Sequence, residues 1–391
     1  MKSVLKYHFI PLIIGLTISS ILLIFGTSIL KSKSENNTIT VKGTKTTVRG
    51  YFANLNSNDS SELELVGSLT EKNGISLFGS SELSNETSYI PYYYLPDSLG
   101  IRVNGFGHAF HQSFSMYCEL LALKDYLKDA KICIIVSPGW FEGEGTNIEA
   151  FLEFVKPNFL QRIITDNSIS EFEKYQIGKY LFDNSELIKN PDRKIKYFTS
   201  LYEYNKLPIL SSYLIARNNE FSKIHYKLSR NSKLKKINRK INWSKQFKGL
   251  QTEFVKSINS NKQYISDNYF NSFLKTKDGS IPSEEFANIS LKNQELKDFK
   301  LLINLLIEKK AKPSIIIQNL NPYYYNNLKG FNSTLAIILK LLEKNNIPYL
   351  NMFTPNRKNY IPGILDDRMH SGNLGWMKMN KFIVDTYYAE K

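Results

Sequence analysis

Cysteine is nearly absent from this chain of 391 residues, which contains only Cys118 and Cys133. Two cysteines cannot build a disulfide scaffold, and they cannot supply a cysteine-based zinc site. Cys133 lies in an apolar run, so we interpret it as a small buried hydrophobic residue. His108 and His111 have the spacing of one helix face, but two histidines without a nearby carboxylate or cysteine make a poor zinc site. The sequence therefore predicts neither a metal site nor a cofactor.

Acidic residues are scarce relative to basic ones: 36 Asp and Glu stand against 51 Lys and Arg, a formal net charge of +15. Such a surplus indicates an anionic partner, which can be nucleic acid, phospholipid or an acidic polymer. Hydrophobic residues make up 42% of the chain and aromatic residues 13%, which excludes global disorder and allows a sizeable core. The length fits one large domain or two ordinary ones.

Charged residues are missing altogether from residues 8–30, which are predominantly apolar. About 20 such residues can cross a hydrocarbon core of ~30 Å as a helix. A cleaved signal peptide is the alternative, but its apolar part usually spans only about 7–15 residues and ends in an A-x-A-like site. We therefore predict a transmembrane anchor at residues 8–30, preceded by a cytoplasmic tail at residues 1–7.

The predicted anchor also gives the chain a location. Long domains that follow such an anchor are translocated largely regardless of their charge, so we expect the rest of the chain outside the cytoplasm. This predicts a single-pass protein of the cell membrane, and it argues against nucleic acid as the anionic partner.

The remainder of the chain reads as a spacer and an α/β domain. Residues 31–73 are polar and indicate a spacer with an irregular start of the domain, which then runs over residues 74–391. Apolar runs alternate with helical patterns, and this predicts a five-stranded, doubly wound parallel sheet. The predicted strands are residues 75–78, 101–104, 131–136, 314–317 and 348–352. Ligands of such a sheet bind at the carboxyl ends of its strands.

Residues 147–295 do not follow the alternation and predict a large helical insertion between the third and fourth strands. Within it, the basic segment, residues 223–248, has ten Lys and Arg and no Asp or Glu. Charge runs are usually solvated loops. The alternative is a surface for anionic lipid headgroups or a polyphosphate chain, where each basic residue near a membrane adds about 1 kcal/mol.

A candidate nucleophile follows the first predicted strand. The segment Gly79-Ser80-Ser81 stands where that strand ends and a helix is expected to begin, so Ser81 would lie at the sheet edge. The alternative is an ordinary helix cap, with Ser80 or Ser81 capping and Glu82 in the first turn. A serine nucleophile requires a base, and the base requires an orienting carboxylate.

His370 is the candidate base. It lies in the loop between the last predicted strand and the last helix, at the same sheet edge as Ser81. Asp367, three residues earlier, can turn to face its imidazole, and Asp366 is the second choice. His108 follows the second strand, where we expect it to line the pocket.

Four short motifs in order carry a resemblance to a known family. They are Phe-Gly-Ser-Ser-Glu-Leu after the first strand, glycines after the second, Ser-Pro-x-Trp-Phe at residues 137–141, and Asp-x-x-His at residues 367–370 before Gly-Trp. The arrangement resembles the DltD family, membrane-anchored members of the SGNH hydrolase superfamily, whose sheet is flavodoxin-like. Together with the anchor and the insertion, the resemblance covers the whole chain.

The resemblance implies roles for individual residues. Ser81 would be the nucleophile, His370 its base and Asp367 the group that orients the base, with the amides of Ser81 and Gly107 as oxyanion donors. Gly105 is a possible substitute for Gly107. The superfamily's usual Asn donor after the third strand is not evident, and Gly139 occupies a position where DltD proteins are expected to have Gln.

The resemblance further implies transfer of a D-alanyl ester to teichoic acid or a related anionic envelope polymer. The implied partners are that polymer, a D-alanyl donor and a membrane-bound O-acyltransferase-type protein. Two alternatives stay open: an esterase, thioesterase or O-acyltransferase acting on another envelope glycan, and a non-catalytic, membrane-anchored adaptor that binds polymer. Candidate substrate-binding residues are His108, Tyr92, Gly139 and Trp140.

Overall fold

The computed structural model describes most of the chain beyond its amino terminus. The described residues are 37–41, 44–48, 51–53, 60–84, 87–143, 145–190, 192, 194, 240–258, 261–275 and 283–388. The tail at residues 1–7, the anchor predicted at residues 8–30 and the basic segment up to residue 239 lie outside these ranges. Across the described ranges, no helix has the length and apolar character needed to cross a membrane.

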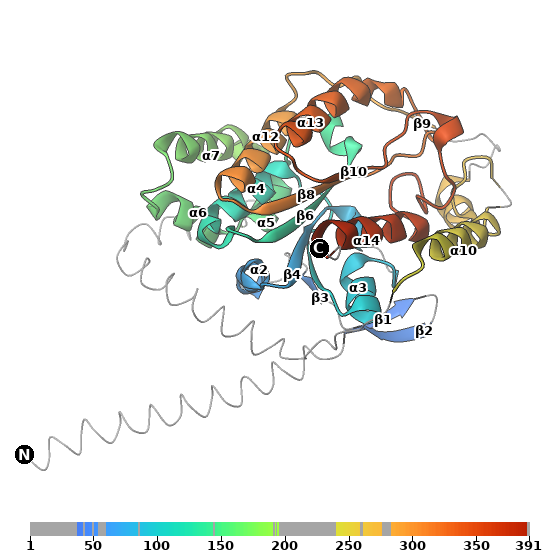
Figure 1. Cartoon of the computed structure of the whole chain (residues 1–391). Helices are drawn as coiled ribbons and strands as arrows, with labels where there is room; N and C mark the ends of the chain where they lie inside the picture. Colours follow the sequence, from blue (N-terminus) through green and yellow to red (C-terminus); the bar gives the residue numbers. More distant parts are fainter. Residues whose placement is uncertain are drawn as a thin grey trace, which may run out of the picture.

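A parallel sheet forms the centre of the described part of the chain (Figure 1). Six strands lie in the order β10-β8-β6-β4-β5-β3, and every pair of neighbours is parallel. Their bounds are β3 Tyr51–Ala53, β4 Gly74–Phe78, β5 Arg102–Phe106, β6 Lys131–Val136, β8 Lys312–Ile317 and β10 Tyr349–Asn351. The last five are the predicted strands, and they follow the flavodoxin-like order. The predicted α/β class with a parallel sheet is confirmed.

The segment predicted as an irregular spacer, residues 31–73, contains regular elements instead. An antiparallel hairpin of β1 (Asn37–Val41) and β2 (Thr44–Val48) precedes β3, and helix α2 (Ser60–Thr70) follows it. Threonine-rich runs read as polar loop, yet threonine is β-branched and favours strands. In α2, Leu65 and Val66 are fully buried in the core. The core therefore begins before residue 74.

Helices cover both faces of the sheet (Figure 1). Helices α3 (Pro91–Leu99) and α14 (Asn373–Tyr387) lie on one face, whereas α4 (Ser113–Ala122), α12 (Gln294–Glu308) and α13 (Asn332–Lys344) lie on the other. Strand β6 shows why both faces are apolar: Ile132 and Ile134 pack in one cluster, and Cys133 and Ile135 pack in the other. Cys133 is buried, as expected. A strand buried on both faces has a continuous apolar sequence.

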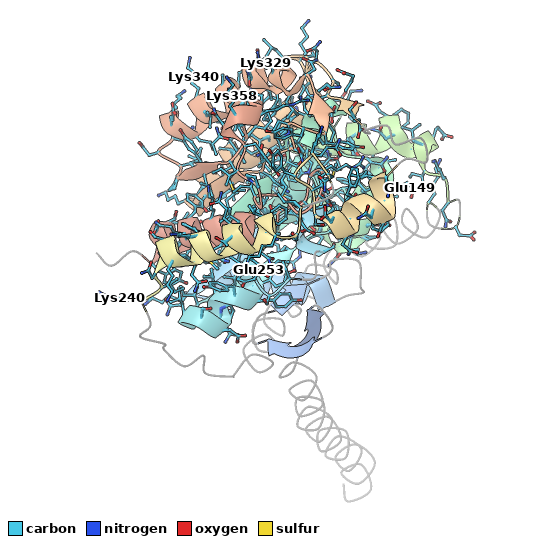
Figure 2. All side chains as sticks on the ribbon, turned by 90° about the vertical axis from the view of Figure 1, so that its right-hand side faces the viewer. Glu149, Lys240, Glu253, Lys329, Lys340 and Lys358 are labelled. Carbon is cyan, nitrogen blue, oxygen red and sulfur yellow. The ribbon has the colours of Figure 1, made fainter. Side chains whose placement is uncertain are left out.

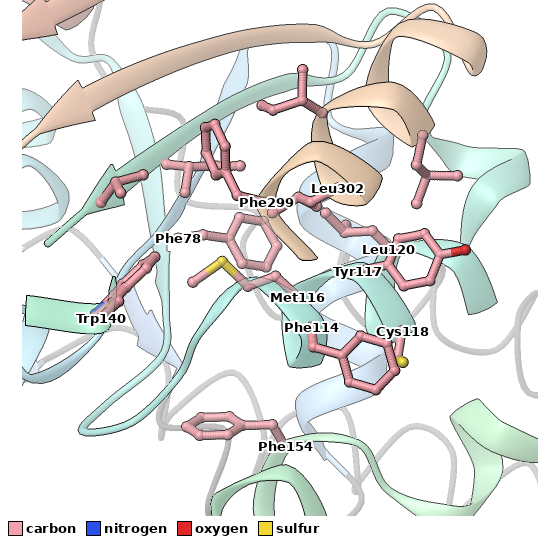
Figure 3. Packing of buried hydrophobic residues seen from close by; sticks show 14 of the residues in the cluster. Phe78, Phe114, Met116, Tyr117, Cys118, Leu120, Trp140, Phe154, Phe299 and Leu302 are labelled. Atoms are coloured by element: carbon pink, nitrogen blue, oxygen red, sulfur yellow. The ribbon is translucent and has the colours of Figure 1, made fainter. Parts of the chain in front are cut away.

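The larger of the two clusters is drawn in Figure 3. It joins the end of β4 to two helices, with Phe78 from the strand, Met116 from α4 and Phe299 from α12. Helix α4 ends at Ala122 and is followed by a 3-10 turn, η2 (Lys124–Tyr126).

The described parts of residues 147–295 are mainly helical. They are packed into the core of the α/β domain and do not form a separate unit. Phe151 and Phe154 of α5 and Phe159 of α6 are almost fully buried in the larger cluster. Helix α10 packs on α14. The elements are α5 Ile148–Phe154, α6 Pro157–Thr165, α7 Glu171–Asn184, η4 Ser185–Leu187, α10 Trp243–Val255, α11 Asp267–Tyr269, the π-helical turn η5 Phe270–Leu274 and β7 Glu284–Glu285. Strand β7 pairs with β9 (Tyr325–Asn326), and two further 3-10 turns are η6 (Leu328–Phe331) and η7 (Arg357–Asn359).

Candidate active site

Ser81 lies just beyond the carboxyl end of β4. The strand ends at Phe78, and the Gly79 amide donates to the carbonyl of Phe106 at the end of β5 (3.2 Å), so the two strand ends are joined. A 3-10 turn, η1 (Ser81–Ser84), follows in place of the expected longer helix. The Ser80 amide donates to Oε1 of Glu82 (2.7 Å), so the turn is closed by a glutamate and not by a serine cap. Ser81 itself is half-buried.

The side chain of His370 joins Ser81 to Asp367. Its Nε2 lies 3.0 Å from Ser81 Oγ, and its Nδ1 lies 2.7 Å from Asp367 Oδ2. The loop that holds the histidine follows β10, while the serine follows β4, so residues 289 positions apart in the sequence meet at one edge of the sheet. A hydroxyl, an imidazole and a carboxylate in this order are the groups that general-base activation of a serine requires.

Asp367 also fixes the loop that carries the histidine. Its Oδ1 accepts hydrogen bonds from the amides of Met369 (2.7 Å) and His370 (2.6 Å). Asp366, the second choice, contributes backbone bonds instead: its amide donates to the carbonyl of His370, and its carbonyl accepts from the amide of Ser266. The imidazole therefore bonds the carboxylate that the three-residue spacing favours.

Burial and charge act in opposite directions on this pair. Burial alone would raise the pKa of Asp367, but the hydrogen bond and the charge of His370, with the amide bonds of the loop, lower it below its usual value. Burial alone would lower the pKa of His370, but its bond to Asp367 raises it. The carboxylate is thus ionised near neutral pH, and it holds a proton on Nδ1 when the imidazole is neutral. Nε2 then faces the serine as an acceptor.

Gly107 lies where a side chain cannot fit. Its φ is +129°, and a Cβ there would lie 2.0 Å from the carbonyl oxygen of Gly79. Gly105 is inside β5, paired with Leu77 of β4, so Gly107 is the glycine that emerges from the strand beside the serine segment. Of the two predicted oxyanion glycines, Gly107 is the one that lies beyond the end of β5 and against the carbonyl of Gly79.

The four predicted substrate-binding residues have different surroundings. His108 is half-buried, with its ring 4.4 Å from that of Phe154, and burial lowers its pKa. Gly139 lies in the 3-10 turn η3 (Pro138–Glu142), where a Cβ would meet only the hydroxyl of Ser137. Trp140 and Tyr92 belong to the core, with 7% and 1% of their surface exposed.

Tyr92 therefore differs from its predicted role. Its hydroxyl donates to the carbonyl of Leu83 (2.6 Å) and so supports the turn that begins at Ser81. Trp140 is likewise packed in the larger cluster. The sequence alone does not show whether an aromatic residue near a predicted site lines the pocket or belongs to the core.

Three neighbours of the site were not recognised from the sequence. Glu82 is buried, and burial raises its pKa although the Ser80 amide opposes this. Gln318, directly after β8, donates to the carbonyl of Met369 in the histidine loop. His111 bonds Glu119, so one of the two histidines expected to be without a nearby carboxylate has one. The position of Gln318 at a strand end was the available signal, whereas nothing in the sequence pairs His111 with Glu119.

His108 and His111 do not converge on a common point: Nε2 of His108 faces Glu153 at 3.7 Å, and Nε2 of His111 faces Glu119 at 2.9 Å. Within the described ranges, no group of three or more His, Cys, Asp or Glu side chains could hold a metal ion.

Comparison with known proteins identifies the family. The model of the DltD protein family matches residues 54–388, nearly the whole chain. The chain belongs to the DltD family. Among curated proteins, none matches it. Membership of the DltD family confirms the resemblance seen in the motifs and links the chain to the D-alanylation of teichoic acids.

Proposed function

We propose that this protein is a serine acyltransferase that moves a D-alanyl group onto teichoic acid or a related anionic envelope polymer. The observation that carries the proposal is the hydrogen-bonded series from Ser81 Oγ through His370 to Asp367, at 3.0 and 2.7 Å. The DltD family supplies the D-alanylation pathway and its teichoic-acid polymers.

In the proposed reaction, His370 Nε2 removes the proton of Ser81 as Oγ attacks the acyl carbonyl. The developing oxyanion rests on the amides of Ser81 and Gly107, and Asp367 stabilises the imidazolium. Collapse of the intermediate gives the protonated donor group and an acyl ester on Ser81. A polymer hydroxyl then gives its proton to the imidazole and attacks this ester. The second collapse returns the proton to Oγ and leaves the acyl group on the polymer.

The location and partners belong to the same proposal. Residues 8–30 would anchor the chain in the cell membrane with the catalytic domain outside the cytoplasm, next to a membrane-bound O-acyltransferase-type partner that supplies the acyl group. The basic segment at residues 223–248 would attract the anionic polymer. Protease added to spheroplasts tests the topology: we expect the domain to be digested, and its protection would reverse the orientation.

Hydrolysis is the second candidate, because the site is not closed to water. The side chain of His370 is 30% exposed and Ser81 is half-buried, so water can compete with a polymer hydroxyl for the acyl ester. Incubation of full-length protein with a D-alanyl ester, with and without polymer, separates the two. A transferase acylates the polymer, whereas an esterase releases free D-alanine at the same rate in both mixtures.

Ser81→Ala tests the proposal as a whole. We expect the folded variant to lose polymer D-alanylation in cells and covalent labelling by a fluorophosphonate in vitro. Ser84→Ala, at the exposed end of the same turn, is the matched control and should keep both. A non-catalytic adaptor would support D-alanylation with either substitution, and this outcome would remove the catalytic proposal.

A further inference from the structure

A second histidine–carboxylate pair lies buried beside the serine segment and takes no part in the proposed proton transfer. His111 and Glu119 are both fully buried, and His111 Nε2 lies 2.9 Å from Glu119 Oε2. The imidazole stacks on the ring of Phe154 at a centroid distance of 4.0 Å. Glu119 comes from α4, so the pair connects the loop after β5 to the helix that follows it.

The other ring nitrogen of His111 faces the segment that leads to Ser81. Its Nδ1 lies 3.3 Å from the carbonyl oxygen of Gly79, which can only accept a hydrogen bond. A hydrogen bond between these two atoms requires the proton on Nδ1. Glu119 secures this state, because one proton shared between its carboxyl group and Nε2 leaves the second ring proton on Nδ1.

The Gly79 carbonyl is also where the two segments with the proposed oxyanion donors touch. A Cβ on Gly107 would lie 2.0 Å from this oxygen and 2.7 Å from His111 Nδ1. The Gly79 amide, which belongs to the preceding peptide unit, donates to the carbonyl of Phe106 at the end of β5. Gly79, two residues before Ser81, is thus tied to β5 through its amide, while its carbonyl lies against Gly107 and His111.

We infer that His111, oriented by Glu119, is a positioning residue for the reaction at Ser81. By donating from Nδ1 to the Gly79 carbonyl, it fixes the distance between the Ser81 and Gly107 amides, which must both reach one oxyanion. This inference rests on the proposed function, because it assigns a task to His111 only if Ser81 is acylated. A displacement of about 1 Å at such a site can reduce a rate by about 10²-fold.

A purely structural role is a poor explanation for the pair. Two buried ionisable groups are expensive to desolvate, and apolar residues of similar volume often give equal or better stability. Glu119 Oε1, moreover, has no hydrogen-bond partner in the described part of the chain, which adds to the cost. The pair costs stability and lies next to the serine segment. We therefore take the hydrogen bond that Nδ1 donates to the Gly79 carbonyl as the reason for its presence.

The test uses full-length protein and p-nitrophenyl acetate as the acyl donor. In the double variant His111→Phe/Glu119→Leu, the ring stacking on Phe154 is kept and both polar groups are removed together. We expect its Tm to equal or exceed that of the wild type, its kcat to fall about 10–100-fold and its KM to stay within about threefold. A folded double variant with the kcat of the wild type would overturn the inference.

A pair of single variants covers the case in which the double variant does not fold. Glu119→Gln can still donate to Nε2 and keep the proton on Nδ1, so its kcat should stay within about threefold of the wild type. Glu119→Leu frees the imidazole to move its proton to Nε2, and its kcat should fall about 10-fold or more per folded molecule. Equal rates in these two variants would contradict the inference.

Ser81→Ala separates this inference from the proposed function. If Ser81→Ala is unreactive and the His111 and Glu119 variants match the wild type, only the positioning role is lost. If Ser81→Ala reacts as fast as the wild type, the proposed function fails and the positioning role fails with it.

Discussion

The loop around Ser81 is shaped by a position that tolerates no side chain. Gly107 combines a φ of +129° with a close approach to the Gly79 carbonyl, where a Cβ would be 2.0 Å away. Gly107→Ala should therefore push the two segments apart. We expect a loss of about 1–3 kcal/mol in the free energy of unfolding and a fall of at least about 10-fold in the rate of Ser81 acylation.

Urea unfolding and the rate of fluorophosphonate labelling measure the two effects of Gly107→Ala. The control is Gly249→Ala in α10, where an added Cβ meets nothing within 4 Å and alanine favours the helix. This control should be as stable as the wild type or slightly more stable. Wild-type labelling by Gly107→Ala would mean that the approach of the two glycines does not matter for the serine.

In the proposed reaction, Asp367 would set the pH range in which His370 acts as a base. Its hydrogen bond raises the pKa of His370 against the effect of burial. In Asp367→Asn that support is lost, so the imidazole becomes neutral at lower pH. The acid limb of the rate–pH profile should move to lower pH, while the maximal rate falls by about 10²–10⁴-fold because the tautomer is no longer fixed.

The measurement for Asp367→Asn is the acylation rate with p-nitrophenyl acetate between pH 4 and 9. Asp366→Asn changes the neighbouring carboxylate in the same way and should keep the wild-type profile. An acid limb that stays in place in Asp367→Asn would show that His370 is not the titrating base.

Among the helices and strands, those with long apolar runs were predictable. Strand β6, with Ile132 to Val136 all buried, could only be a central strand of a parallel sheet. The threonine-rich hairpin has too little apolar sequence to stand out, and its two strands pair with each other. The three residues of β3 are also too few to stand out, and they form because the neighbouring edge of β5 is available. Local sequence does not contain that edge.

The same limit applies to contacts between elements. Glu295 in the first turn of α12 accepts from the amide of Ser113 at the start of α4, 182 residues away. No spacing in the sequence indicates a cap from such a distance. The site itself was predictable to the extent that strand ends define it: Ser81 and His370 follow strands, and Asp367 is local to His370. Glu119 and His111 were not, because their pairing depends on how α4 packs.

The buried carboxyl group of Glu295 should make the stability of the protein depend on pH. Burial raises the pKa of Glu295 to about 8, with a further contribution from Asp298. The folded state thus binds a proton that the unfolded state releases near pH 4.5, so the contribution of Glu295 to stability falls as pH rises from about 5 to 8. Glu295→Gln keeps an acceptor for the Ser113 amide without a charge. We expect the variant to gain about 1–4 kcal/mol relative to the wild type over this range.

Urea unfolding at pH 5, 6.5 and 8.5 checks the Glu295→Gln prediction. Glu308→Gln, exposed near the end of the same helix, removes a carboxylate without changing a buried one and should follow the pH dependence of the wild type. If Glu295→Gln and the wild type lose stability in parallel, then Glu295 is ionised in both states.

At the scale of the whole molecule, the fold is built on one central sheet with two apolar faces, and helices of the long insertion pack into the core beside it. Phe154 of α5 lies against both His108 and His111, so the first helix after β6 helps to hold the loop after β5. The alternation of predicted strands and helices sets the insertion apart from the sheet. It does not show that helices of the insertion pack against the loop after β5. The insertion is thus part of the environment of the site and not only a carrier of basic charge.

Basic side chains occur both in the basic segment and elsewhere on the surface of the molecule, so the effect of the segment can be separated from that of net charge. The basic segment follows α7 in the chain and ends within α10, and its residue Lys240 lies at the lower edge of the described part in Figure 2. Lys329, Lys340 and Lys358 are exposed at the upper edge of the described part. If the segment attracts an anionic polymer, neutralising Lys233, Lys235 and Lys236 to Gln should raise the KM for polymer several-fold at low salt. Screening makes the effect smaller as ionic strength rises.

A control variant that loses the same number of positive charges shows whether the basic segment itself attracts the polymer. Lys329→Gln/Lys340→Gln/Lys358→Gln lowers the net charge by the same amount outside the segment, and its KM for polymer should change by less than about twofold. Both triple variants should hydrolyse p-nitrophenyl acetate like the wild type, because a small neutral ester does not sense the added field. Equal KM values for polymer in the two triple variants would assign the attraction to the net charge of the molecule and leave the basic segment without a binding role.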